Sequence, residues 1–191
     1  MRIAHFLTAM VTAASIALVI VPAQAQSLPT DRGPALGQVV EFTAKLDAHD
    51  GGQYALADLA GPKGTALFFN RSLDWCPFCQ KQTEDLIKNS ALLTDAGYGI
   101  AVVTYDSPAK LKKFAVKQNP SFPLLSDTGS ANIIALGLLN EKYKPGSFAY
   151  GIPHPMIIVI GTDGAVKAKF AEEGYKVRPV LQDVVRQLKN S

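Results

Sequence analysis

The sequence predicts an α/β fold, and two observations indicate it. Two apolar runs, at residues 65–69 and 156–160, have the length and composition of buried strands. Strand-like and helix-like segments alternate along the chain, which ends in an amphipathic helix opened by Pro179. Such alternation indicates a sheet sandwiched between helices.

Residues 1–25 are expected to be an export signal that is cleaved after Ala25. A basic start precedes an uncharged apolar run over 6–21, and Ala23-x-Ala25 has the small-residue pattern of a cleavage site. The run of about 16 residues is shorter than the ~20 that a spanning helix needs. We therefore expect a periplasmic or secreted protein with no stable membrane span.

The remaining chain of about 165 residues is long enough for one domain with a full core. Residues 26–36 are rich in Pro, Gly and polar side chains, and we expect a flexible arm there. Residues 37–191 then form the domain. The net charge of the chain is +3. Removing Arg2 with the leader leaves about +2, which does not indicate nucleic acid as a partner.

The expected elements follow from local patterns. A hairpin is predicted from alternation over 39–46, a turn at 50–52 and a returning strand at 54–56. Further helices are expected from Pro77 to about 93, from Pro108 to before Pro120, and at 130–136. Further extended segments are expected at 100–105, at 122–125, and at 165–170, where the last of them is a hairpin partner. The last helix is expected to have one apolar face, made of Val180, Leu181, Val184, Val185 and Leu188.

The only two cysteines of the chain lie in one motif, Trp75-Cys76-Pro77-Phe78-Cys79, soon after the first apolar strand. Pro77 suits the first position of a helix because it has no N–H group to leave unpaired. Cys76 then lies at the helix N-terminus with Cys79 one turn further on, close enough to form a disulfide. The free N–H groups and the helix dipole favour the thiolate of Cys76. The motif predicts a redox-active dithiol.

Other roles for the two cysteines fit the sequence less well. A zinc site needs two more ligands, and His49 and His154 lack paired spacing. Covalent haem attachment needs His where Gln80 stands. A purely structural disulfide would constrain the unfolded chain little, because the loop is so short. We expect no metal and no cofactor beyond the cysteine pair, with a non-catalytic or zinc-holding domain as an alternative.

The motifs together resemble the thioredoxin fold and, within it, the AhpC/TSA redoxin class of peroxiredoxin-like proteins. The resemblance covers roughly residues 36–189 and is carried by the leading hairpin and by the segments 71–79, 123–127 and 151–155. It implies a central mixed sheet flanked by helices, with an N-terminal β-hairpin extension. It also implies that Cys79 acts as the resolving thiol.

The resemblance implies a thiol-based oxidoreductase, and two forms of it stay open. In the first, Cys76 and Cys79 exchange disulfides with protein or small-molecule thiols and are recycled by a separate redox partner. In the second, Cys76 attacks a peroxide and Cys79 condenses with the resulting sulfenic acid. Leu73 stands where peroxiredoxins carry Thr or Ser, and Pro155 stands near their Arg, which counts against efficient peroxide reduction. The direction of electron flow depends on reduction potential, which the motif does not give.

The resemblance also assigns substrate-positioning residues. Pro155 fits the register of a cis-proline that faces the dithiol and exposes a backbone edge to the substrate. His154 would then lie within reach of the thiols and stabilise a thiolate when protonated. Trp75, next to Cys76, is assigned to the same substrate-positioning group.

Three further residues are expected behind or beside the dithiol. Asn70 lies six residues before the first cysteine, where similar proteins often place a buried Asp or Asn. An amide there can orient water or a thiol but cannot take up a proton. Arg71 and Ser72, in the same loop, are the candidates to replace the missing Thr and Arg of peroxiredoxins.

Overall fold

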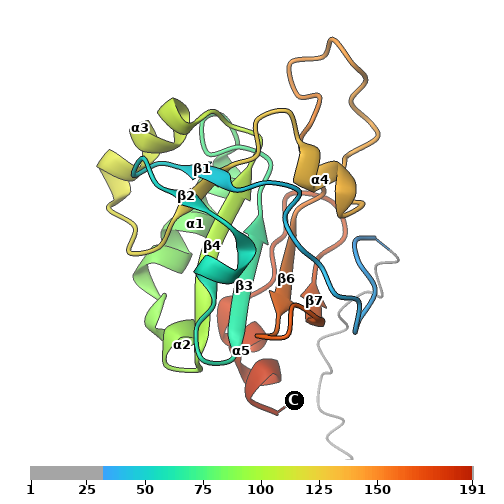
Figure 1. Cartoon of the computed structure of the whole chain (residues 1–191). Coiled ribbons are helices and arrows are strands. Elements are labelled where there is room, and N and C mark those ends of the chain that lie inside the picture. Colours follow the sequence, from blue (N-terminus) through green and yellow to red (C-terminus); the bar gives the residue numbers. More distant parts are fainter. Residues whose placement is uncertain (1–31, 191) are drawn as a thin grey trace, which may run out of the picture.

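The structure, a computed structural model, describes residues 32–190, so the expected export signal and most of the arm lie outside the described residues. Within them one seven-stranded sheet has the order β2-β1-β5-β4-β3-β6-β7 (Figure 1). The central strand β3 runs parallel to β4 and antiparallel to β6, so the sheet is mixed, as expected. The strands are β1 (Leu46–Ala48), β2 (Gln53–Tyr54), β3 (Gly64–Phe69), β4 (Tyr98–Thr104), β5 (Leu124–Ser126), β6 (Met156–Ile160) and β7 (Val166–Phe170).

Helices cover both faces of this sheet. They are η1 (Leu56–Leu59), α1 (Pro77–Lys88), α2 (Ala91–Thr94), α3 (Pro108–Gln118), α4 (Ala131–Ala135) and α5 (Leu181–Asn190). One core cluster joins the sheet to α1, α3 and α5, and a second joins it to α4 and η1. Between α4 and β6 the chain projects from the rest of the molecule as a long loop (orange in Figure 1). None of the described helices has the length and apolar character needed to cross a membrane.

The apolar run of β3 is explained by its central position. Ala66 and Phe68 belong to the first core cluster, whereas Leu67 and Phe69 belong to the second. All six residues of the strand are buried. A strand covered by helices on both faces needs apolar side chains at successive positions, not at alternate ones.

The N-terminal hairpin is present, but its first strand is shorter and later than predicted. β1 begins at Leu46, which pairs with Tyr54 across the turn. The earlier residues instead follow the β6–β7 hairpin, where Gly37 N donates to Val166 O at 2.8 Å and Val40 N donates to Gly164 O at 2.9 Å. The predicted strand over 39–46 is therefore wrong. Alternation indicates an extended segment but does not identify the edge with which it pairs.

Two helix predictions also need correction. The helix expected to continue to about residue 93 ends at Lys88, where the side chain of Asn89 donates to the carbonyl of Asp85. Such side-chain bonds compete with the helical backbone pattern, and a separate helix α2 follows. Val180 precedes α5 and is 55% exposed, whereas the other four residues of the predicted apolar face are buried. The remaining elements lie within two residues of their predicted bounds.

Candidate active site

The dithiol lies where the sequence predicts it, between the end of β3 and the start of α1. Cys76 is the N-cap of α1, Pro77 is the first helical residue, and Cys76 is joined to Cys79 in a disulfide with a Cα–Cα distance of 5.3 Å. The Sγ of Cys76 accepts a hydrogen bond from the backbone N–H of Cys79 at 3.3 Å. An N–H group at the free end of the helix therefore points at the first sulfur, as expected for a stabilised thiolate.

Both cysteines are buried to the same degree. Cys76 is 1% exposed and Cys79 is 0% exposed, so burial does not distinguish the two sulfurs. Both belong to the first core cluster, and Trp75 and Phe78 pack against it. A reacting partner can reach either sulfur only when the side chains around the disulfide shift.

The loop before the disulfide is held by a buried carboxylate that the sequence reasoning missed. Asp106, just after β4, accepts hydrogen bonds from Ser72 Oγ at 2.8 Å, Leu73 N at 2.6 Å and Thr104 Oγ1 at 3.1 Å. Burial raises the pKa of Asp106, against the effect of these donors. Ser72 Oγ in turn accepts from the backbone N–H groups of Asp74 and Trp75. Ser72 thus organises the loop, and none of its hydrogen bonds within residues 32–190 involves a sulfur atom.

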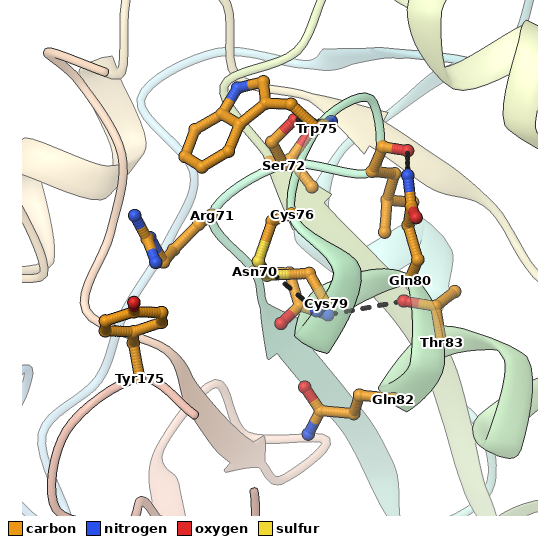
Figure 2. Close-up of a disulfide and its surroundings, with 12 residues drawn as sticks. Asn70, Arg71, Ser72, Trp75, Cys76, Cys79, Gln80, Gln82, Thr83 and Tyr175 are labelled. Carbon is orange, nitrogen blue, oxygen red and sulfur yellow. Dashed lines mark hydrogen bonds between the residues drawn. A yellow bond between two sulfur atoms is a disulfide. The ribbon is translucent and has the colours of Figure 1, made fainter. Parts of the chain in front are cut away.

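Arg71 lies beside the disulfide in a box of aromatic rings. Figure 2 shows its side chain between Trp75 and Tyr175, with the guanidinium directed away from the two sulfurs. The guanidinium carbon is 4.3 Å from the ring centroid of Tyr175 and 5.0 Å from that of Trp75. Its Nη2 donates to the hydroxyl of Tyr143 at 3.1 Å, while its Nε is buried without a hydrogen-bond partner. Arg71 is 5% exposed, so a fixed positive charge stands at the site.

Trp75 is held by groups from distant parts of the chain. Its indole N–H donates to the hydroxyl of Tyr105 at 3.0 Å, and its ring meets Phe148 edge-on at a centroid distance of 5.4 Å. Phe148 belongs to the projecting loop, so Trp75 links the dithiol to that loop. Its assignment to substrate positioning stays a prediction.

A second arginine, Arg178, contacts the disulfide directly. Its Nη2 donates to Cys79 Sγ at 3.4 Å and its Nε donates to Gln82 Oε1 at 3.1 Å. Burial, and then the like charge of Arg71, lower the pKa of Arg178 to about 10. The sequence reasoning missed this residue because no local pattern connects position 178 with the motif.

Asn70 contacts the same helix as the cysteines, one turn beyond Cys79. It is buried, and its Nδ2 donates to Thr83 Oγ1 at 3.3 Å (Figure 2). Its Oδ1 is buried with no hydrogen-bond partner among the described residues. A buried amide oxygen without a partner costs free energy that a bound water or a thiol proton would recover. The role of Asn70 in orienting such a group stays a prediction.

The predicted cis bond at Pro155 is wrong, because residues 32–190 contain no cis peptide bond. The segment before β6 pairs with the chain after α4 instead. His154 N donates to Leu138 O at 2.7 Å, and Pro153 forms a bridge with Leu139. This pairing leads the backbone into β6 in an extended form, for which the favoured trans isomer suffices.

Pro155 and His154 nevertheless share a cavity with Arg71. The cavity has a volume of about 520 Å³, and Tyr143 and Tyr175 also line it. His154 Nε2 lies 2.7 Å from the carboxylate of Glu141, and this hydrogen bond is the main cause that lowers the pKa of Glu141 to about 2. The imidazole is therefore paired with a carboxylate. His154 was expected to contact the thiols, but no hydrogen bond within residues 32–190 joins it to either sulfur.

The arrangement of side chains around the dithiol can also be compared with what a metal site needs. Across residues 32–190 no group of three or more His, Cys, Asp or Glu side chains is arranged to hold a metal ion. The two thiols that would begin a zinc site are joined to each other. The side chains around them supply guanidinium groups and aromatic rings, which are not metal ligands.

A mixed sheet with a C-x-x-C disulfide at the start of the helix after its central strand defines a thioredoxin-fold dithiol redox protein. The chain belongs to the AhpC/TSA family, whose sequence profile matches residues 36–169. It is 31% identical to peroxiredoxin Bcp of Escherichia coli K12 over 125 residues, which are 65% of this chain and 78% of the relative. Family membership makes the protein a thiol-based, peroxiredoxin-like oxidoreductase.

Solved structures give the same fold. Peroxiredoxin Q of Xanthomonas campestris matches with a TM-score of 0.66 and 25% identity, over 80% of this chain and 95% of that one. Peroxidoxin BcpB of Mycobacterium tuberculosis matches with a TM-score of 0.68 and 20% identity, over 81% and 96% of the two chains. The second likeness is one of fold alone.

Proposed function

We propose that the protein is an exported thiol oxidoreductase that exchanges disulfides with a partner through Cys76 and Cys79. The observation that carries the proposal is the position of the pair. The two sulfurs are bonded across the first turn of α1, with a backbone N–H directed at Cys76 Sγ. This arrangement allows the pair to take up and release two electrons without any other cofactor.

The exchange proceeds in two substitutions at sulfur. A partner thiolate attacks Cys76 Sγ, the S–S bond breaks, and its electron pair goes to Cys79 Sγ. A second partner thiolate then attacks the partner sulfur of the mixed disulfide, which releases an oxidised partner and the Cys76 thiolate. In the reverse direction the reduced pair donates two electrons to a substrate disulfide, and a separate redox partner restores it.

Peroxide reduction is the second candidate, and the peroxiredoxin relatives favour it. The Cys76 thiolate would attack a peroxide oxygen, the O–O bond would break, and the leaving oxygen would take up a proton from solvent and depart as water or an alcohol. Cys76 becomes a sulfenic acid, and Cys79 condenses with it to release water and form the disulfide. The buried guanidinium of Arg71 supports this candidate, because it lies against Trp75 in the loop before the dithiol and supplies positive charge there.

One pair of assays on the reduced wild-type protein separates the two candidates. We expect it to reduce a disulfide-bonded substrate protein catalytically when a thiol reductant is supplied. The same preparation is then mixed with hydrogen peroxide, and peroxide loss is followed against closure of the Cys76–Cys79 pair. Peroxide loss that outpaces disulfide reduction would make the peroxidase reaction the main activity. If neither reaction occurs while the pair remains intact, both candidates are wrong.

Export is proposed from the sequence of residues 1–25. In an oxidising compartment the pair must be kept reduced by a partner, or must act as an oxidant. We expect the protein, expressed from its full gene in a bacterium with a periplasm, to be recovered outside the cytoplasm with Gln26 as its first residue. N-terminal sequencing checks this, and an intact Met1 on the exported protein would contradict it.

A further inference from the structure

Arg178 lies between β7 and α5, and its guanidinium is held against the disulfide. Its Nη2 donates to Cys79 Sγ at 3.4 Å and its Nε donates to Gln82 Oε1 at 3.1 Å. Its Nη1 donates to the backbone carbonyls of Val177, at 3.0 Å, and Tyr175. Every nitrogen of the group is engaged, so the cation keeps a fixed position next to the second sulfur.

No carboxylate in the described part of the chain balances this charge. The ion pairs among residues 32–190 include neither Arg178 nor Arg71. Arg178 remains a cation at neutral pH, because its lowered pKa is still about 10. Arg178 is only partly buried, but the partial loss of water around a cation without a counterion still carries a cost, and a negative charge formed beside it would reduce that cost.

We infer that Arg178 is a catalytic residue whose counterion is the Cys79 thiolate formed when the disulfide opens. The inference rests on the proposed exchange at the same pair. When a partner thiolate attacks Cys76 Sγ, a bond forms between those two sulfurs and the Cys76–Cys79 bond breaks. The electron pair of the broken bond goes to Cys79 Sγ, which leaves as a thiolate against Arg178.

Arg178 stabilises the reacting state more than it stabilises the disulfide, because Cys79 Sγ carries no negative charge before the S–S bond breaks. A neutral disulfide sulfur accepts only a weak hydrogen bond, whereas a thiolate accepts a charge-assisted one. Binding that strengthens as charge develops lowers the barrier, and a stabilised thiolate leaves faster. The two sulfurs therefore have separate stabilising groups, since Cys76 Sγ accepts from the N–H of Cys79 and Cys79 Sγ accepts from Arg178.

The test follows each thiol alone. In a Cys76→Ser protein, the rate of iodoacetamide labelling of Cys79 is measured against pH with and without Arg178→Gln. We expect the midpoint of that profile to move to higher pH, and Arg178→Lys to return it towards its original position. In the protein with both cysteines, Arg178→Gln should slow opening of the disulfide by dithiothreitol roughly three- to eightfold at constant pH.

Matched variants separate the effect of losing the Arg178 charge from the effect of disturbing the structure around it. Gln82→Ala removes one contact that positions Arg178 but keeps the cation, so it should move the Cys79 profile less than Arg178→Gln does. Arg186→Gln removes an exposed arginine of α5 and should change nothing. If the Gln variant does not fold, Arg178→Met, which keeps the aliphatic stem, is measured instead.

Two results would overturn the inference. One is a Cys79 profile that does not move on loss of the guanidinium. The other is an equal shift for Cys76 in a Cys79→Ser protein, which would indicate a general electrostatic effect. The labelling experiment needs no redox partner, so its outcome is independent of whether the proposed disulfide exchange is found.

Discussion

Replacing Cys76 with Ser is expected to reduce thiol-dependent turnover on the order of 10³-fold or more, whichever substrate the protein uses. The side chain is the N-cap of α1 and its sulfur receives the backbone N–H of Cys79, so it is the better placed nucleophile. A serine hydroxyl fits the same position but is not ionised at neutral pH. Turnover is measured with the disulfide-reduction and peroxide assays on both proteins.

Cys79→Ser is the matched control because it leaves the nucleophile in place. That variant should still attack its partner, but it cannot resolve the intermediate, so a mixed disulfide should accumulate on non-reducing gels. If Cys76→Ser traps the partner instead and Cys79→Ser does not, the two roles are reversed. Iodoacetamide labelling of the reduced wild-type protein gives an independent check, with faster labelling of Cys76 expected at neutral pH.

Asp106→Ala is expected to lower the free energy of unfolding by about 3 kcal/mol, because it leaves buried donors without an acceptor. The carboxylate accepts from Ser72 Oγ, Leu73 N and Thr104 Oγ1. Denaturant unfolding measures the change, and Asp95→Ala, at an exposed position, should stay within about 0.5 kcal/mol of the wild type. A loss no larger than that of the control would mean that Asp106 does not hold the loop.

The same carboxylate gives a pH dependence with a definite sign. Burial raises the pKa of Asp106 above its ordinary 3.8 in the folded protein, so folding favours the protonated form. Its contribution to stability is fully present below the unfolded pKa and is lost as the pH rises through the folded pKa. Relative to Asp106→Asn, which does not titrate, the wild type should therefore gain stability as the pH falls through that window.

The fold was largely predictable because its main signals are local. The apolar runs at β3 and β6 and Pro77 at the start of α1 each specify their own element, and the structure has all three. The partner of the extended N-terminal segment was not predictable in this way. Residues 37–40 lie along the β6–β7 hairpin, a pairing between segments more than a hundred residues apart that alternation does not encode.

The residues of the site also fall into two groups, those that a local sequence pattern predicts and those that it does not. Cys76, Trp75 and Arg71 are neighbours in sequence, and the structure keeps them together beside the helix N-terminus. Asp106 and Arg178 come from other parts of the fold, and only tertiary packing brings them to the loop and the second sulfur. Family register suggested a cis bond at Pro155, but backbone pairing of the preceding segment decided the local path.

The burial of the disulfide has a kinetic consequence. A bond between residues that are 1% and 0% exposed reacts only in the fraction of molecules that is transiently open. If about one molecule in a hundred is open at a time, the apparent rate constant falls about a hundredfold below that of an exposed disulfide. A partner that binds and stabilises the open form recovers that factor, whereas a small thiol in solution does not. Selectivity for the partner can thus arise from the opening equilibrium, even where the exchange chemistry is the same for every thiol.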